Sequence, residues 1–520
     1  MKLHELHIND FKFFSEVEPD SPLLKINGNH LLIYGENGSG KSTIYWALYT
    51  LLESSLKKDN DDIRKYFKKT GDDSLVNIHS TGKNNSFIKI VLKDDAGTNP
   101  KTFRVSRKSR DLSIRGNADV VKSSMATDFI NYRVLFQLHN LKHSKENDLW
   151  LWFEEEVLPY VKKGAEPCLK ELELLNKGPE KIRNLQGEDV FPTASLRTAP
   201  TIEERGDYQK YKTYKQKVKA WNDWLKGFLS DITNNANSLI EQEFQYNFKI
   251  KLDLETKFPE FAATDEKIKW FNPQIIISIP EYEGIQNPKI KKPHTFLNEA
   301  KWSAIGLSLR FAILDIKLYN ADLKSLVIDD MILSLDMSNR DVVINLLLNK
   351  YINDYQLILM THDRFFFELA KYKISQSSLT NWKYFEMFEH NNGVITKPLI
   401  IEGTSKINKV WALYHRKELA LAANTLRKAT EKLCKAYLTA QERLNADYSV
   451  QKLHQMIEAF RTKGAANGLD ANKLTRLLEY KDRILNPNSH YDIETPLFKN
   501  ELKKAIETVE ELANDTGINV

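Results

Sequence analysis

Apolar and polar residues alternate along the amino-terminal part of the chain with the two-residue period of β-strands. Residues 31–34 depart from this alternation and form one apolar run, which has the length of a buried strand. Residues 43–49 follow without glycine or proline and predict a helix. The strands expected in this region are residues 2–9, 31–34, 86–93 and 102–106, the last two as a hairpin around a turn at 94–97.

Helical periodicity dominates the chain from about residue 146 to residue 247. This stretch is much too short for a long coiled coil, so we interpret it as an inserted helical arm. A segment with proline and glycine at 187–206 interrupts it, and Trp221 and Trp224 are expected to be packing residues rather than a binding cage. The expected helices are 149–163, 165–177 and 206–247.

Strand patterns return after the arm, and helical patterns close the chain. The expected strands are 247–253, 274–280, 326–330, 357–360 and 382–388, the last at an edge of the sheet, followed by a linker at 401–405. The carboxy-terminal helices are expected within 407–439, 450–462, 471–485 and 495–514. We therefore predict an α/β head with a mixed sheet, a helical insertion and a carboxy-terminal all-α bundle, divided as 1–145, 146–247, 248–403 and 404–520.

Composition narrows the class of protein only moderately. The 520 residues are 28% charged and 42% hydrophobic, which is typical of a soluble globular protein and excludes a disordered chain. No apolar run is long enough to span a membrane, and the start of the chain does not resemble a signal peptide. The net charge of +5 permits a nucleic-acid partner without requiring one. Cys168 and Cys434 fit no metal-ligand spacing, and we expect buried thiols in a reducing cytoplasm.

A glycine-rich segment, Gly-Glu-Asn-Gly-Ser-Gly-Lys-Ser at 35–42, separates the first buried strand from the helix that follows it. In this position the glycines allow backbone N–H groups to surround a phosphate, and the start of the helix adds partial positive charge. Lys41 is predicted to reach the β- and γ-phosphates and Ser42 to offer its hydroxyl to Mg²⁺. An ordinary glycine-rich turn is the alternative, which the strand before and the helix after the motif disfavour.

Two later strands end in side chains suited to hydrolysis. The apolar run 326–328 leads into Asp329 and Asp330, so that the first acid is expected to help hold Mg²⁺ and the second to orient water. The run 357–360 is followed by Thr361 and His362, and in an α/β sheet ligands bind at such carboxyl ends. The alternatives are a strand entering a turn and a structural histidine.

The order of these motifs resembles the ABC ATPase head of the Rad50 and SMC class. The resemblance rests on the phosphate loop, the helical insertion, Leu-Asn-Glu-Ala-Lys at 297–301, the two aspartates, Leu335-Asp336 and His362. It implies ATP and Mg²⁺ as cofactors and a second subunit that completes each nucleotide site. The residues implied for nucleotide binding are Lys12, Asn37, Gly38, Gly40, Lys41, Ser42, Thr43 and Asn298. The residues implied for binding the metal are Ser42, Asp329 and Gln137, with Asn131 as a rival of Gln137. The residues implied for hydrolysis are Asp330 and His362, with Asp336 as the D-loop acid.

Two features depart from that family. Asn298 stands in the place of the signature serine, and both glycines of the signature are missing, so the backbone there must approach phosphate differently. Asp330 replaces the usual glutamate, and its shorter reach predicts slow hydrolysis, which suits a switch better than a motor.

The last block contains Arg483, Asn486 and His490, which resemble the R-x(4–6)-H motif of HEPN domains, small helical bundles that often act as metal-free ribonucleases. Asn486-Pro487 is expected to end a helix, because the residue before proline avoids the helical conformation. Histidine can transfer protons near neutral pH and arginine can bind a phosphate through two donors, so the pair suits RNA cleavage by the 2′-hydroxyl. The alternatives are a histidine that caps a helix or bonds a carboxylate such as Asp492, and a degenerate HEPN domain that only dimerises or binds RNA.

An ATPase joined to a HEPN-like domain resembles the bacterial anticodon nucleases and the PtuA-type ATPases of Septu and retron-linked phage defence, where an HNH nuclease partner is usual. The resemblance implies a cytoplasmic homodimer or larger homo-oligomer that controls cleavage of RNA through Arg483 and His490, with tRNA as a candidate substrate. The alternative is a regulatory scaffold that holds and releases a separate nuclease. A Rad50-like repair ATPase is less favoured because the arm is short.

Overall fold

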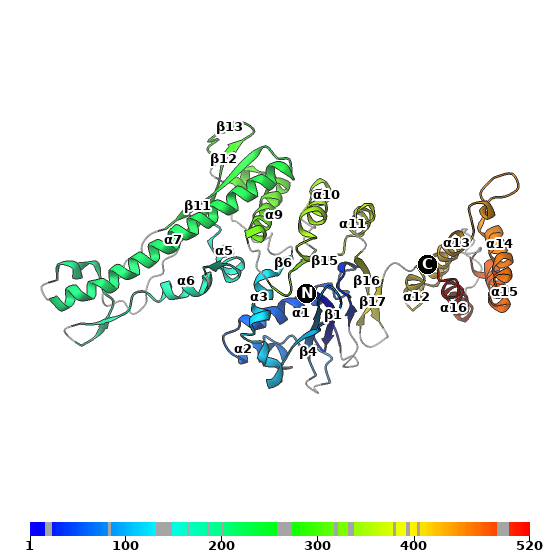
Figure 1. Ribbon diagram of the computed structural model, residues 1–520, viewed down its shortest axis with the longest axis horizontal. Helices are drawn as coiled ribbons and strands as arrows, with labels where there is room; N and C mark the ends of the chain where they lie inside the picture. Colours follow the sequence, from blue (N-terminus) through cyan, green and yellow to red (C-terminus); the bar gives the residue numbers. More distant parts are fainter. Residues whose placement is uncertain are drawn as a thin grey trace.

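The structure is a computed structural model with the α/β head between the arm at one end and the terminal helical bundle at the other (Figure 1). Among the described residues, no helix has both the length and the apolar character needed to cross a membrane. The description covers the chain except residues 16–22, 82–84, 132–147, 165, 185–186, 200–201, 257–272, 291, 317–320, 331–336, 378–380, 392–395, 403–405, 416 and 486–498.

A six-stranded sheet forms the centre of the head, and its neighbouring strands are parallel except for the pair β16 and β17. The carboxyl ends of the parallel strands therefore meet at one edge, which is where ligands bind in sheets of this kind. In spatial order the strands are β17 (Thr396–Glu402), β16 (Trp382–Asn391), β3 (His30–Gly35), β15 (Gln356–Thr361), β14 (Ser325–Asp329) and β6 (Asp128–Asn131).

Both faces of this sheet are covered, which explains why its strands are continuous apolar runs. Leu31 and Ile33 point to one face and pack with α1 (Lys41–Glu53), whereas Leu32 points to the other face. The helices on that second face are α9 (Glu299–Ile316), α10 (Met337–Leu346) and α11 (Arg364–Gln376), which lie together in Figure 1.

A smaller antiparallel sheet covers the outer side of α1. It contains the predicted hairpin, in which Gly97 N donates to Asp94 O at 2.9 Å. Its spatial order is β2 (Leu24–Lys25), β1 (Lys2–Asn9), β4 (Phe87–Lys93) and β5 (Lys101–Ser106), and the helices beside it are α2 (Asp61–Arg64) and α3 (Ala118–Ala126).

The prediction that residues 382–388 form an edge strand is wrong. These residues belong to β16, which lies between β3 and β17, and Met387 is fully buried. The true edge is β17, where Pro398 lacks an N–H group and the edge position tolerates this. Ile401 and Glu402, expected in a linker, still belong to this strand.

The arm is built on α7 (Ile202–Gln242), which packs along β11 and α9. Trp221 is fully buried in this core, as expected for a packing residue. The other elements are α5 (Trp150–Glu156), β7 (Lys162–Lys163), β8 (Glu166–Pro167), α6 (Cys168–Asn176), β9 (Ile182–Arg183), β10 (Asp189–Val190), β11 (Phe248–Glu255), β12 (Gln274–Tyr282), β13 (Ile285–Gln286) and α8 (Pro293–Phe296).

The first arm helix is shorter than predicted. It ends at Glu156 rather than 163, and a 3₁₀ turn, Leu158–Tyr160, follows it. Pro159 lies in that turn and cannot donate the backbone hydrogen bond that a continuing helix needs. The chain then forms the short β7–β8 pair instead of more helix.

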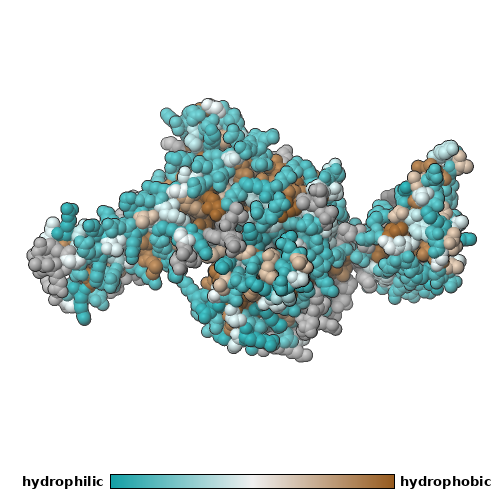
Figure 2. Space-filling view, in the orientation of Figure 1, coloured by the Kyte–Doolittle hydropathy of each residue, from teal (hydrophilic) through white to brown (hydrophobic). Residues whose placement is uncertain are grey.

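The terminal bundle has its own core, and Figure 2 shows its visible face as mostly hydrophilic with a few hydrophobic patches. The predicted helix 471–485 changes to a π-helical segment at Lys481–Leu485. The bundle consists of α12 (Lys406–His415), α13 (Leu419–Tyr437), α14 (Leu453–Ala466), α15 (Ala471–Tyr480) and α16 (Lys499–Thr516).

A buried ion pair joins the two parts of the head that the arm separates in the sequence. Arg310 on α9 donates to both carboxylate oxygens of Asp128 on β6, at 2.9 and 2.6 Å, and each side chain is only 3% exposed. A third bond runs from Arg310 Nη1 to Glu156 O at 3.1 Å, at the end of α5. The pair therefore ties α9 to the sheet and to the base of the arm.

Replacing Asp128 by asparagine is expected to lower the free energy of unfolding of the head by about 3–5 kcal/mol, because Arg310 would remain charged and buried after losing the carboxylate that it bonds directly. Thermal and urea denaturation followed by circular dichroism would measure the loss. Asp322→Asn is the control, since Asp322 pairs with a part-exposed Lys101 and should matter by less than about 1 kcal/mol. Equal effects from the two substitutions would contradict this reading of the buried pair.

Candidate nucleotide-binding site

The phosphate loop connects β3 to α1, and two of its glycines adopt conformations that other residues avoid. Gly38 and Gly40 have φ values of 86° and 101°, and Gly40 is the residue that caps α1. A Cβ atom on Gly38 would lie 2.0 Å from Glu389 Oε1, and one on Gly40 would lie 3.0 Å from Phe13. The loop thus needs glycine at both positions for its backbone angles, whereas the flexible end of Glu389 could move away from a side chain at position 38.

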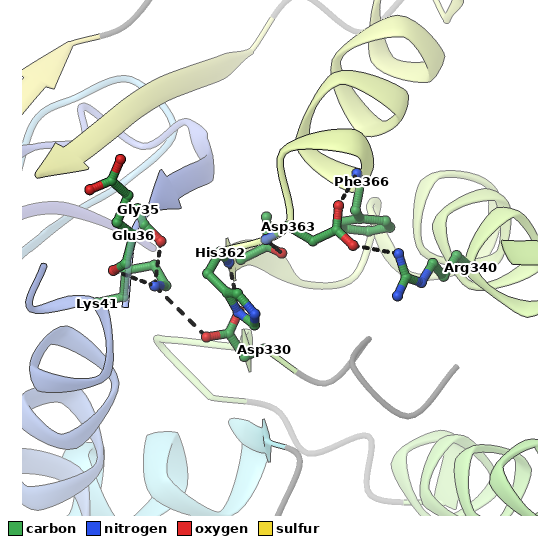
Figure 3. Close-up of polar contacts among 9 residues, drawn as sticks. Gly35, Glu36, Lys41, Asp330, Arg340, His362, Asp363 and Phe366 are labelled. Carbon is green, nitrogen blue, oxygen red and sulfur yellow. Dashed lines mark hydrogen bonds and ion pairs between the residues drawn. The ribbon is translucent and has the colours of Figure 1, made fainter. Parts of the chain in front are cut away.

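Lys41 points back into this loop (Figure 3). Its Nζ donates to Gly35 O at 2.6 Å and to Glu36 O at 3.2 Å, and the side chain is 3% exposed. Asp330 Oδ2 lies 3.8 Å from the same nitrogen. Burial lowers the pKa of Lys41, although Asp330 and other nearby carboxylates oppose the shift. A buried ammonium at the centre of the loop is well placed to bind the β- and γ-phosphates.

Asp329 lies at the end of β14 and is almost completely buried. Burial raises the pKa of its carboxyl to about 6, although a hydrogen bond from Ser42 acts in the opposite direction. Its Oδ1 has no hydrogen-bond partner among the described residues. A hydroxyl and a buried carboxylate oxygen side by side are hard oxygen ligands, so Ser42 and Asp329 fit Mg²⁺ bound together with nucleotide phosphates.

Asp330 and His362 form a second polar unit beside Lys41 (Figure 3). Asp330 Oδ1 accepts from the backbone N–H of His362 at 2.8 Å and lies 2.8 Å from its Nδ1. Asp330 itself has a φ of 48°, in the left-handed region that aspartate tolerates better than most residues. The turn after β14 thus directs its carboxylate toward the end of β15.

The structure brings together Lys41, Asp329, Asp330 and His362, which the sequence analysis predicted as site residues. Because β15 lies between β3 and β14, the residues that end these strands reach one edge of the sheet. Asn37, Gly38, Gly40 and Thr43 all belong to the loop or to the first turn of α1.

Lys12 lies beside the phosphate loop, whereas Asn298 lies at the start of α9. Lys12 belongs to the turn whose Phe13 contacts Gly40, and its Nζ lies 5.5 Å from the centre of the Trp46 ring. Asn298 precedes α9, where its Oδ1 accepts from Lys301 N at 2.9 Å. The signature segment does begin a helix, and none of the contacts recorded for the described residues joins Asn298 to the phosphate loop.

The terminal bundle holds Arg483, away from this site. Arg483 lies in the π-helical segment, is 63% exposed, and pairs with Glu501 at 2.6 Å. Gln137, Asp336, Asn486 and His490 lie outside the described residues.

Sequence reasoning missed Arg340 and Asp363. Asp363 caps α11, because its side chain accepts from Phe366 N, and it also pairs with Arg340 on α10. The preference for aspartate at helix starts could have revealed the cap. Nothing local in the sequence indicates that Arg340 reaches it from another helix.

A buried lysine in a glycine loop, a hydroxyl beside a buried aspartate, and an aspartate–histidine pair define a nucleotide-binding ATPase domain with a phosphate loop. A family model described as an AAA domain matches residues 5–269, slightly more than half of the chain. The chain belongs to this AAA domain family.

No curated protein matches the sequence. Three solved structures superimpose loosely on most of the chain. An SMC head bound to the C-winged helix domain of ScpA has a TM-score of 0.40 at 12% identity and covers 78% of this chain and 98% of its own. The Smc head with an extended coiled coil bound to the C-terminal domain of ScpA, derived from Pyrococcus furiosus, has a TM-score of 0.37 at 12% identity, with 80% and 99% covered. The SMC head from Thermotoga maritima has a TM-score of 0.32 at 16% identity, with 77% and 100% covered.

Replacing Asp329 by asparagine is expected to stabilise the nucleotide-free protein at pH 7 while removing its response to Mg²⁺ and ATP. The folded pKa of about 6 lies above the ordinary value of 3.8, so the stability that the protonated carboxyl gives is fully present below pH 3.8, falls as the pH rises from 3.8 to about 6, and is lost above pH 6. A shift of this size corresponds to at most about 3 kcal/mol.

The measurement is the melting temperature of both proteins between pH 4 and 8, with and without Mg²⁺–ATP. The melting temperature of the variant should exceed that of the native protein most clearly above pH 6. The difference should shrink toward pH 4, where Asp329 of the native protein is uncharged, like the asparagine. A variant that is less stable than the native protein at pH 8 without nucleotide would show that burying the charged Asp329 carboxylate does not destabilise the fold.

Proposed function

We propose that the chain is an ATP-binding, slowly hydrolysing ATPase head of the Rad50 and SMC type. In a bacterial anti-phage system it would control RNA cleavage through its own terminal domain, with tRNA as the candidate substrate. The observation that carries the ATPase part is the convergence of Lys41, Asp329 and the Asp330–His362 pair at one edge of the sheet. Membership of the AAA domain family supports the same activity.

The residues of the site have separable roles in hydrolysis. Lys41 exchanges the carbonyl oxygens of Gly35 and Glu36 for phosphate oxygens, which carry more negative charge. Ser42 and Asp329 would hold Mg²⁺, and the metal would neutralise charge on the phosphates. Asp330 orients the attacking water, and His362 holds the Asp330 carboxylate through its ring and its backbone N–H.

The proposed dimer follows from what one chain leaves incomplete. Under the resemblance to ABC heads, the start of α9 with Asn298 would face the γ-phosphate held by a second copy. An isologous dimer repeats each contact, so it would complete two nucleotide sites and could pair two terminal bundles at once. Closure of the heads would then set the distance between the two bundles.

The ribonuclease part rests on Arg483 and on the sequence after it. The guanidinium is mostly exposed at the end of α15, where it could reach a phosphate. Arg427 on α13 donates to Leu485 O at 3.1 Å and so holds the end of the segment that carries Arg483. π-Helical turns of this kind are frequent at functional sites.

One contact favours the second function, a regulatory scaffold that holds and releases a separate nuclease. Glu501 pairs with Arg483 at 2.6 Å, and its negative charge opposes the approach of an RNA phosphate to this arginine. In that reading the terminal bundle serves assembly, and a partner of the HNH nuclease type would cut.

Asp330→Asn is expected to lower the rate of ATP hydrolysis about 100-fold or more while ATP still binds, because the amide cannot accept a proton from the attacking water. Phosphate release and equilibrium binding of a fluorescent ATP analogue measure the two steps. Asp95→Asn is the control, since Asp95 is an exposed surface carboxylate. Hydrolysis at the normal rate would remove Asp330 from this role, and rapid turnover by the native protein would contradict the slow switch.

Cells that express the native chain are expected to show growth arrest and cut RNA, whereas His490→Ala and Arg483→Gln should leave RNA intact. Arg461→Gln is the matched control, because Arg461 is an exposed arginine of the same bundle that pairs only loosely with Glu458. RNA ends are mapped by sequencing, with and without neighbouring genes. The same cuts in the His490→Ala strain would assign cleavage to another nuclease and favour the scaffold.

A further inference from the structure

The turn that carries His362 is held from a second direction. Asp363, the next residue, caps α11 through its Oδ1, which accepts from Phe366 N at 3.0 Å. Its Oδ2 accepts from Arg340 Nη1 on α10 at 2.5 Å. Figure 3 shows these groups in a row, from Lys41 through Asp330 and His362 to Asp363 and Arg340.

This ion pair is shielded from water, with the Arg340 side chain 14% exposed and the Asp363 side chain 22% exposed. Burial opposes ionisation of Asp363, but the hydrogen bonds from Phe366 N and Arg340 outweigh it and lower the pKa of the carboxyl. The pair is therefore charged at neutral pH. A charge-assisted bond of this kind fixes the geometry more firmly than an exposed pair.

The first turn of α10 is itself anchored. Asn339 precedes Arg340 and is 2% exposed. Its Nδ2 donates to Ala300 O at 3.3 Å in the first turn of α9, and its Oδ1 accepts from the hydroxyl of Tyr246 at 3.4 Å, just after α7. Arg340 thus extends from a turn that is fixed to α9 and to the end of the arm.

We propose that Arg340 is a positioning residue for ATP hydrolysis, which holds His362 against Asp330 by fixing Asp363. The inference rests on the ATPase part of the proposed function. Arg340 bonds Asp363, the residue next to His362, and so acts on the histidine through this neighbour. If Asp363 moved, the adjacent His362 would lose the geometry of its 2.8 Å contact with Asp330.

A second ion pair between the same two helices separates positioning from simple packing. Asp341, the next residue of α10, pairs with Lys373 of α11 at 2.8 Å, with side chains 43% and 28% exposed. This pair joins α10 to α11 nearly three turns further along α11 than Asp363. Asp341→Asn is therefore a control that weakens the contact between the helices without touching the His362 turn.

The first test is kinetic. Arg340→Gln is expected to lower kcat by about 10- to 100-fold with little change in KM, because the loss is one of alignment rather than of nucleotide binding. Asp363→Asn keeps a good helix cap but removes the charge, and should cause the same loss. The double variant should lose no more than either single variant, Arg340→Lys should recover part of the rate, and Asp341→Asn should behave like the native protein.

The second test needs no hydrolysis. Diethyl pyrocarbonate labels accessible histidines, and mass spectrometry of the nucleotide-free full chain measures the rate at His362. Labelling should be faster in Arg340→Gln and Asp363→Asn, and unchanged in Asp341→Asn. Native rates of labelling and of turnover in Arg340→Gln would overturn the inference. A native protein that binds no ATP would overturn the proposed function instead, while the labelling result would still decide the role of Arg340.

Discussion

The site depends on keeping one positive charge out of water. Lys41 is enclosed by its own loop, where two carbonyl oxygens and the nearby carboxylates, Asp330 foremost, compensate its ammonium group. Such a cation is costly to bury unless its partners are fixed, because each lost contact leaves charge in a medium of low polarity. The strand order supplies the fixed partners, since β14 and β15 end in the residues that face the loop.

The features that could be read from the sequence are those encoded within a few residues. The phosphate loop follows from glycine spacing between a strand and a helix, and the two aspartates and His362 follow from polar residues directly after apolar runs. Each signal is local, and the parallel sheet then places the strand ends together. The pair of Arg340 and Asp363 joins positions 23 residues apart and leaves no periodic pattern, so only the packed structure reveals it.

The predictions that proved wrong concern features that a local pattern of side chains does not determine. Residues 382–388 look like an edge strand because their alternation does not show whether a further strand follows, and that neighbour, β17, is a separate segment. The helix expected through residue 163 has suitable side chains, but Pro159 removes a donor and the chain forms a 3₁₀ turn. The pairing of Arg483 with Glu501, which the sequence did not predict, depends on how the segment after α15 packs against α16.

The length of α7 has a mechanical consequence. With 41 residues, this helix is roughly 60 Å long, and it packs along α9 near its end in the head. A rotation of one degree at that end displaces the far tip by roughly 1 Å, so motions too small to disturb the core would be amplified outside it. Conversely, a modest force at the tip would exert a large torque on α9.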